Sequence, residues 1–201
     1  NTTSVPKPRE LLPDWMVGLT DRVMNYYTKR YLNCEPVILK NPPLPQEGHQ
    51  YMLYAHVPFC HTLCTYCTFH RFLFKEWKAR EYFQNLRKEM EYVKALGYDF
   101  TAMYVGGGTT TILEDELVKT LELAKKLFPS IKEISCETDP QVIMTPQFRN
   151  LQGLVDRMSI GVQSFNDEIL KLSDRYEKFG SGEQIYERLQ YAQELFPTCN
   201  V

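Results

Sequence analysis

Apolar residues recur along the chain with two different periods, and these periods predict the order of its helices and strands. Short apolar runs typical of strands occupy residues 51–57, 102–105, 131–137 and 154–162. Apolar residues at helical spacing follow each strand, within residues 79–93, 117–127, 146–151 and 185–195. Gly97 and Pro129 are typical breakers and end the first two of these helices. We therefore predict four strand–helix units in succession.

Successive strand–helix units require parallel strands joined by crossover helices, so the pattern predicts an α/β fold that is either an open sheet or a barrel. In both arrangements ligands bind at the carboxyl ends of the strands. A further strand is expected to begin after Pro197, only a few residues before the last residue, Val201. We therefore expect the fold to be truncated at its C-terminal end.

The first fifty residues follow a different pattern. The proline-rich stretch 41–48 cannot hold a regular helix or a central strand, and it predicts a connector. Before it, apolar residues recur at helical spacing after Pro13 and Asp14, namely Trp15, Met16, Leu19, Val23, Tyr26 and Tyr27. They predict one amphipathic helix that packs against the main domain. We assign residues 1–50 to an N-terminal extension with its connector, and residues 51–201 to the main domain.

Composition and charge narrow the class of protein. The chain is 43% hydrophobic and 24% charged, which is typical of a globular domain. Its formal net charge of −2 comes from mixed signs, so neither a nucleic acid nor an anionic membrane surface is an expected partner. No run of about 18 apolar residues predicts a membrane span. We expect a cytoplasmic protein whose partners are small molecules.

Three of the six cysteines lie within eight residues, directly after the first strand: Cys60, Cys64 and Cys67. Disulfides at such short range would be strained, so reduced thiols that bind a metal are the better interpretation. Three cysteines on a [4Fe–4S] cluster leave one iron open to a reactant, whereas electron-carrying clusters normally take four. A zinc site is the alternative and needs one more ligand. The candidates for that ligand are His56, His61, His70 and Cys136.

Several segments, the cysteines among them, occur along the chain in a fixed order. They are Tyr54–Cys60, the spacing of the three cysteines with Tyr66 before the last, Tyr104–Thr109, Glu137–Pro140 and Met158–Phe165, with Arg175 twelve residues after Gln163. Together they resemble the oxygen-independent coproporphyrinogen III oxidase-like family of radical S-adenosylmethionine (SAM) enzymes. That family also includes haem chaperones and haem-degrading relatives.

The resemblance implies a partial (β/α)6-type radical SAM barrel in residues 51–201, which would be an incomplete core. It implies that Cys60, Cys64 and Cys67 hold a [4Fe–4S] cluster whose open iron binds SAM. A low-potential electron donor would reduce the cluster, and the resulting 5′-deoxyadenosyl radical would act on a porphyrin or haem-related substrate. No side chain beyond the cluster is expected to be catalytic. The residues expected to contact SAM are Tyr54, Tyr66, Gly107, Gly108, Thr109, Glu137, Gln163 and Arg175.

Each polar or glycine position also has a simpler interpretation. The glycines at 106–108 would let a ligand approach the backbone closely, or they form a flexible turn. Glu137 would accept hydrogen bonds from both hydroxyls of a ribose, or it is a solvated residue at a strand end. Arg175 offers a planar fork suited to a carboxylate, or it is solvated on a surface helix. The remaining cysteines are interpreted as small buried apolar residues, and these are Cys34, Cys136 and Cys199.

Two departures from the family pattern leave the reaction open. The decarboxylating members carry a fourth cysteine where this chain has Phe69, which argues against a plain coproporphyrinogen decarboxylase. Thr110 stands where the glycine motif usually continues with proline, a change that affects loop stiffness more than chemistry. The alternatives are a haem chaperone that binds and transfers haem, a radical SAM methyltransferase, and a zinc-stabilised binding module without redox chemistry.

Overall fold

The computed structural model describes residues 13–32 and 41–201, and the chain divides into two compact units, Asn1–Pro43 and Leu44–Val201. The described part of the first unit contains the predicted helix, α1 (Asp14–Tyr31). Asp14 in its first turn and Lys29 and Arg30 in its last turn interact favourably with the helix dipole. Within its own unit α1 buries none of its side chains, and its packing against the main domain stays a prediction.

A five-stranded parallel sheet forms the centre of the second unit, with strand order β1-β4-β5-β6-β7. The strands are β1 (Met52–Val57), β4 (Ala102–Gly107), β5 (Glu133–Thr138), β6 (Arg157–Ile160) and β7 (Thr198–Asn200). The four predicted strands are confirmed, and β7 begins after Pro197 as expected. β6 is shorter than the apolar run predicted, because the backbone leaves the sheet at Gly161 and reaches a positive φ of 72° at Gln163.

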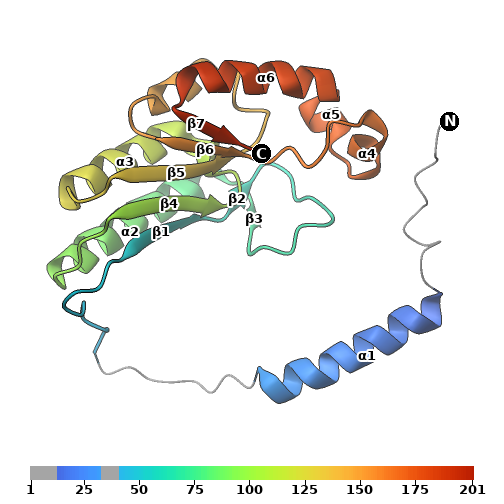
Figure 1. Ribbon diagram of the computed structural model, residues 1–201, viewed down its shortest axis with the longest axis horizontal. Helices are drawn as coiled ribbons and strands as arrows, with labels where there is room; N and C mark the ends of the chain where they lie inside the picture. Colours follow the sequence, from blue (N-terminus) through green and yellow to red (C-terminus); the bar gives the residue numbers. More distant parts are fainter. Residues whose placement is uncertain (1–12, 33–40) are drawn as a thin grey trace. The chain divides into compact units, whose positions relative to one another are not determined.

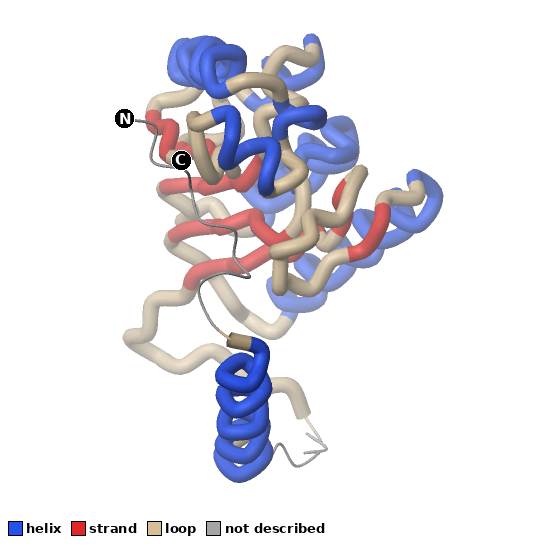
Figure 2. The backbone as a smooth tube through the Cα atoms, turned by 90° about the vertical axis from the view of Figure 1, so that its right-hand side faces the viewer, coloured by secondary structure: helices blue, strands red, loops and turns tan. Residues whose placement is uncertain are grey.

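The segments between the strands hold the helices α2 (Glu76–Ala95), α3 (Glu114–Leu127), η3 (Pro146–Leu151) and α6 (Gly182–Leu195). In Figure 1 these helices run from α2 behind β1 and β4 to α6 above β6 and β7, and Figure 2 shows them after a 90° turn. Parallel crossovers are almost always right-handed, so strands added always on the same side place their helices on one face. This is the order of a (β/α) barrel, and the predicted α/β fold is confirmed.

Side chains along each strand alternate between the two faces of the sheet. The positions that face the helices are buried and form the core, namely Ala55, Val57, Met103, Val105, Ile134, Cys136, Met158 and Ile160. Each large apolar side chain buried there contributes about 1.5–3 kcal/mol. The opposite face carries polar side chains that stay partly exposed, among them Tyr54, His56, Tyr104, Glu137 and Ser159. That face is therefore the one on which a ligand can be bound.

Several short elements were not predicted, because two to six residues are too few to show a period. They are β2 (Phe59–Cys60), β3 (Phe72–Leu73), η2 (Thr110–Leu113), α4 (Asp167–Leu172) and α5 (Tyr176–Phe179). The described part of the predicted connector, residues 41–48, contains no helix or strand, as expected. None of the helices within the described residues has the length and apolar character of a membrane span. Cys34 lies outside the described residues.

Candidate functional site

Residues 60–71, called here the cysteine loop, carry all three clustered thiols. The loop begins in β2 and returns in β3, and these strands pair in parallel through Phe59 with Phe72 and Cys60 with Leu73. Two backbone hydrogen bonds close the loop at its base, from Phe72 N to the Pro58 carbonyl (2.6 Å) and from Phe74 N to the Cys60 carbonyl (2.9 Å). The three thiols thus lie on one loop whose two ends are held together by hydrogen bonds.

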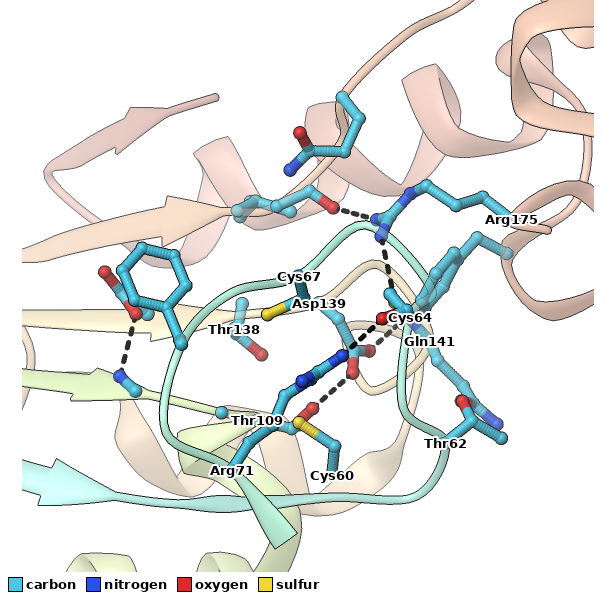
Figure 3. Close-up of a pocket in the computed structure, with 18 of the residues that line it drawn as sticks. Cys60, Thr62, Cys64, Cys67, Arg71, Thr109, Thr138, Asp139, Gln141 and Arg175 are labelled. Carbon is cyan, nitrogen blue, oxygen red and sulfur yellow. Dashed lines mark hydrogen bonds between the residues drawn. The ribbon is translucent and has the colours of Figure 1, made fainter. Parts of the chain in front are cut away.

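A pocket of about 450 Å³ lies between the cysteine loop and the carboxyl ends of the sheet strands. Figure 3 shows the loop around this pocket, with Cys60 and Cys67 on it. The pocket is lined by the predicted site residues Cys60, Cys64, Tyr66, Cys67, Gly107, Gly108, Thr109, Glu137, Gln163 and Arg175. Tyr54 is not among the lining residues, and its hydroxyl lies 2.9 Å from His56 Nδ1.

The glycine run is fixed against the cysteine loop. Gly108 N donates to the Val57 carbonyl (2.8 Å), and Thr109 N donates to the Phe59 carbonyl (2.8 Å). A Cβ atom on Gly108 would lie 2.5 Å from the Phe59 carbonyl oxygen and 2.9 Å from Cys60 Sγ. The run is therefore a close contact between the sheet and the metal-binding segment, and a flexible turn does not describe it.

Gly108→Ala is expected to destabilise the cysteine loop, because the new methyl group meets a backbone carbonyl that cannot move without opening β2. We expect a loss of about 1–3 kcal/mol in the free energy of unfolding, as for other overpacked sites. Gly161→Ala is the matched control, because its Cβ would find only ordinary contacts, the nearest at 3.6 Å. Chemical denaturation of both variants measures the difference, and equal stabilities would contradict the role assigned to Gly108.

Glu137 lies at the end of β5 with both carboxylate oxygens engaged. The Tyr104 hydroxyl donates to Oε1 (2.7 Å), and Gly107 N donates to Oε2 (3.0 Å). A carboxylate has about four lone-pair sites, so each oxygen can still accept from a ligand. Glu137 is thus held in one orientation and can accept from a pair of hydroxyls in the pocket.

Arg175 is 5% exposed, so the alternative of a solvated arginine on a surface helix is wrong. It precedes α5 as its N-cap, and its guanidinium lies 4.2 Å from the centre of the Phe179 ring. Nη1 donates to the Tyr66 hydroxyl (2.8 Å), and Nη2 donates to the Gly161 carbonyl. Its buried Nε has no hydrogen-bond partner. An unpaired buried donor costs about 1–3 kcal/mol, so this arginine fits an acidic ligand group in the pocket.

Gln163 also faces the pocket, three residues beyond β6. Its φ of 72° is left-handed, a conformation that costs a residue with a side chain about 1–2 kcal/mol. Such strain is concentrated at ligand sites, where surrounding contacts hold it. The exposed amide of Gln163 is therefore set at the pocket by the backbone turn that ends the strand.

Three further contacts at the site were not predicted. Thr109 Oγ1 donates to Asp139 Oδ2 (2.8 Å), and Arg71 Nη2 donates to the Cys64 carbonyl. Arg71, at the end of the cysteine loop, and Arg175, before α5, both reach toward Cys64 (Figure 3), where Arg175 Nη1 is 4.0 Å from Sγ. Asp139 belongs to a segment that the resemblance identified, whereas no spacing in the sequence points to Arg71.

The structure explains why the chain has Thr110 where the family usually has proline. Its hydroxyl lies 3.0 Å from Cys136 Sγ and donates to the Glu137 carbonyl, which proline could not do. Burial raises the pKa of the Cys136 thiol to about 12, so this cysteine stays protonated. Its interpretation as a small buried residue is confirmed, and Cys199 is only partly buried.

The donor set suits an iron–sulfur cluster. Burial raises the pKa of the Cys60 thiol, and hydrogen bonds from Thr109 oppose this by favouring the thiolate. The three thiols line one pocket, although among the described residues no three histidine, cysteine or acidic side chains lie close enough to hold a single metal ion. A zinc ion would hold its sulfur ligands at about 2.3 Å. Three thiols around an open pocket fit a cluster that keeps one iron without a protein ligand.

Comparisons with known proteins agree with this geometry. The family model described as the radical SAM superfamily matches residues 54–201. The haem chaperone HemW of Bacillus subtilis (strain 168) is 33% identical over 132 residues, which are 62% of this chain and 35% of that protein. The oxygen-independent coproporphyrinogen III oxidase of Escherichia coli (strain K12) is 32% identical over 157 residues, covering 74% of this chain and 34% of that protein.

A solved structure shares the fold. It is the coproporphyrinogen III oxidase HemN of Escherichia coli, described as a radical SAM enzyme. It superimposes with a TM-score of 0.63 at 30% identity, over 74% of this chain and 36% of that chain. The present chain thus spans about a third of the length of these curated relatives.

Proposed function

Because the chain belongs to the radical SAM superfamily, we propose that its cysteine loop holds a [4Fe–4S] cluster and that the adjoining pocket binds SAM. The observation that carries this proposal is the meeting of three thiols, a glycine edge, a carboxylate and a buried arginine in one pocket. These groups come from the cysteine loop, the ends of β4 and β5, and the turn before α5, and they match the chemical groups of SAM.

Each residue has a role that follows from its contacts. Gly107 and Gly108 line the pocket, where their backbone would meet the methionine part of SAM, and a Cβ atom on either would clash with His56 or Phe59. Glu137 would accept from the ribose hydroxyls, and Arg175 would donate its free Nε toward the carboxylate. Tyr66 and Gln163 complete the pocket wall beside them. No side chain is required as a general acid or base.

When bound, the cluster and SAM supply a one-electron cleavage of the S–C5′ bond and a 5′-deoxyadenosyl radical. The electron would come from a low-potential donor. The protein would hold SAM beside the open iron and keep water away from the radical. The partly exposed polar face of the sheet lies next to the pocket and would bind the molecule that the radical attacks.

For the substrate we propose a porphyrin or haem-related molecule, because the relatives are a haem chaperone and a coproporphyrinogen III oxidase. The haem chaperone is the second candidate, because HemW is as similar to this chain as the oxidase is. Phe69 lines the pocket where decarboxylating members have a cysteine, which favours another outcome, such as methyl transfer or haem transfer.

One experiment separates enzyme from chaperone. The protein is reconstituted with iron and sulfide under anaerobic conditions, then incubated with SAM and a strong reductant. The enzyme proposal expects 5′-deoxyadenosine in amounts well above the protein concentration. Tight haem binding without 5′-deoxyadenosine would instead support the chaperone, and a colourless protein with stoichiometric zinc would contradict both.

A further inference from the structure

Tyr104 belongs to the segment Tyr104–Thr109 but is not among the expected SAM contacts, and it bonds to Glu137, which lines the pocket. Tyr104 lies on the open face of β4, and its hydroxyl is 2.7 Å from Glu137 Oε1 on the neighbouring strand. The register pairs Tyr104 with Ser135, so Glu137 lies two residues further along β5, on the same face. The tyrosine ring therefore reaches along the sheet to the carboxylate.

Gly106 leaves room for the Tyr104 and Glu137 side chains because it has no side chain of its own. A Cβ atom on Gly106 would lie 2.9 Å from the Tyr104 ring and 3.2 Å from the Glu137 carboxylate. The ring of Tyr54 on β1 stacks on the Tyr104 ring, with a centroid distance of 6.1 Å and an interplanar angle of 19°. These contacts limit the movement of the Tyr104 ring.

The tyrosine is a permanent donor at this contact. Burial and the hydrogen bond to Glu137 raise the pKa of Tyr104 to about 12, so the phenol stays protonated over the physiological range. With Gly107 N on the other oxygen, the hydroxyl fixes the plane of the carboxylate. Without it, Glu137 keeps a single donor and is free to rotate about its last torsion.

We propose that Tyr104 is a positioning residue that orients Glu137 toward a vicinal diol before the ligand binds. The proposal rests on the proposed function, because the diol it specifies is that of a ribose. Preorganisation of an acceptor improves affinity by removing the cost of ordering it on binding. The gain must therefore appear only for ligands that carry both hydroxyls.

The test compares adenosine with 2′,3′-dideoxyadenosine, which lacks both hydroxyls, by equilibrium binding to the reconstituted chain. In Tyr104→Phe the affinity for adenosine is expected to fall about tenfold, as for the loss of one charge-assisted hydrogen bond, while dideoxyadenosine binds as before. Tyr191→Phe is the matched control, because its hydroxyl bonds Arg149 away from the pocket. Thermal unfolding of each variant separates binding from stability.

The outcomes distinguish the two proposals. If the wild-type chain prefers adenosine and Tyr104→Phe keeps the same preference, the positioning role is overturned and the proposed function stands. If Tyr104→Phe loses affinity for adenosine and for dideoxyadenosine by the same factor, the role is structural and the proposal also fails. If the wild-type chain does not distinguish the two nucleosides, the ribose site itself is contradicted.

Discussion

Replacing any one of Cys60, Cys64 and Cys67 by alanine is expected to abolish assembly of a stable [4Fe–4S] cluster. All three thiols line one pocket from one loop, and among the described residues no further cysteine lines it. Loss of a residue that hydrogen-bonds to a metal ligand already lowers metal affinity or activity about 10–100-fold. Loss of a direct ligand should therefore reduce cluster content and SAM cleavage at least about 100-fold. Iron and sulfide content after anaerobic reconstitution, together with 5′-deoxyadenosine formation, measures both effects.

Cys199→Ala is the control, because Cys199 lies on β7 outside the pocket lining. It should assemble a cluster as the unaltered chain does. A Cys64→Ala chain that keeps its full iron content and its cleavage activity would show that the ligands are elsewhere. Loss of cluster in Cys199→Ala to the same degree would point to general misfolding.

Arg175→Lys is expected to weaken SAM binding by about 100-fold, although the charge is kept. The guanidinium donates to Tyr66 and Gly161 at once, stacks on Phe179 and has one buried donor to spare. A lysine ammonium is a compact point charge without this fork, so it cannot make these contacts together. The loss of one charge-assisted hydrogen bond to the carboxylate of SAM, worth about 1.5–3 kcal/mol, accounts for the magnitude.

Arg149→Lys provides the comparison, because Arg149 also donates to a tyrosine hydroxyl and lies 5.3 Å from the centre of its ring, but outside the pocket. Equilibrium binding of SAM should be unchanged in that variant. Equal affinities in the two variants would contradict a direct role for Arg175. A loss of folding stability without a loss of affinity would limit Arg175 to anchoring the cysteine loop.

Much of the fold could be predicted because long apolar periods determine it. The helices α2, α3 and α6 and the strands β1, β4 and β5 each bury a regular set of side chains, so their spacing is visible in the sequence. The pair β2 and β3 could not be predicted, since each strand has two residues and owes its pairing to the cysteine loop that it closes. The pairing of β2 with β3 depends on tertiary contacts and not on local strand propensity.

The site shows the same division. The resemblance identified residues that the structure brings together, because ordered segments at strand ends meet at one edge of a parallel sheet. The burial of Arg175 could not be read from its place before a four-residue helix. The bond from Tyr104 to Glu137 depends on the register of β4 against β5, which the sequence alone does not specify.

The central claim is that the three cysteines leave one iron of a cluster open to SAM. It is tested most directly by electron paramagnetic resonance of the reconstituted, reduced chain before and after SAM is added. A ligand that binds the open iron changes the electronic environment of the cluster, so we expect a reduced [4Fe–4S] signal whose shape shifts on addition of SAM. A cluster signal that stays the same at saturating SAM would contradict it.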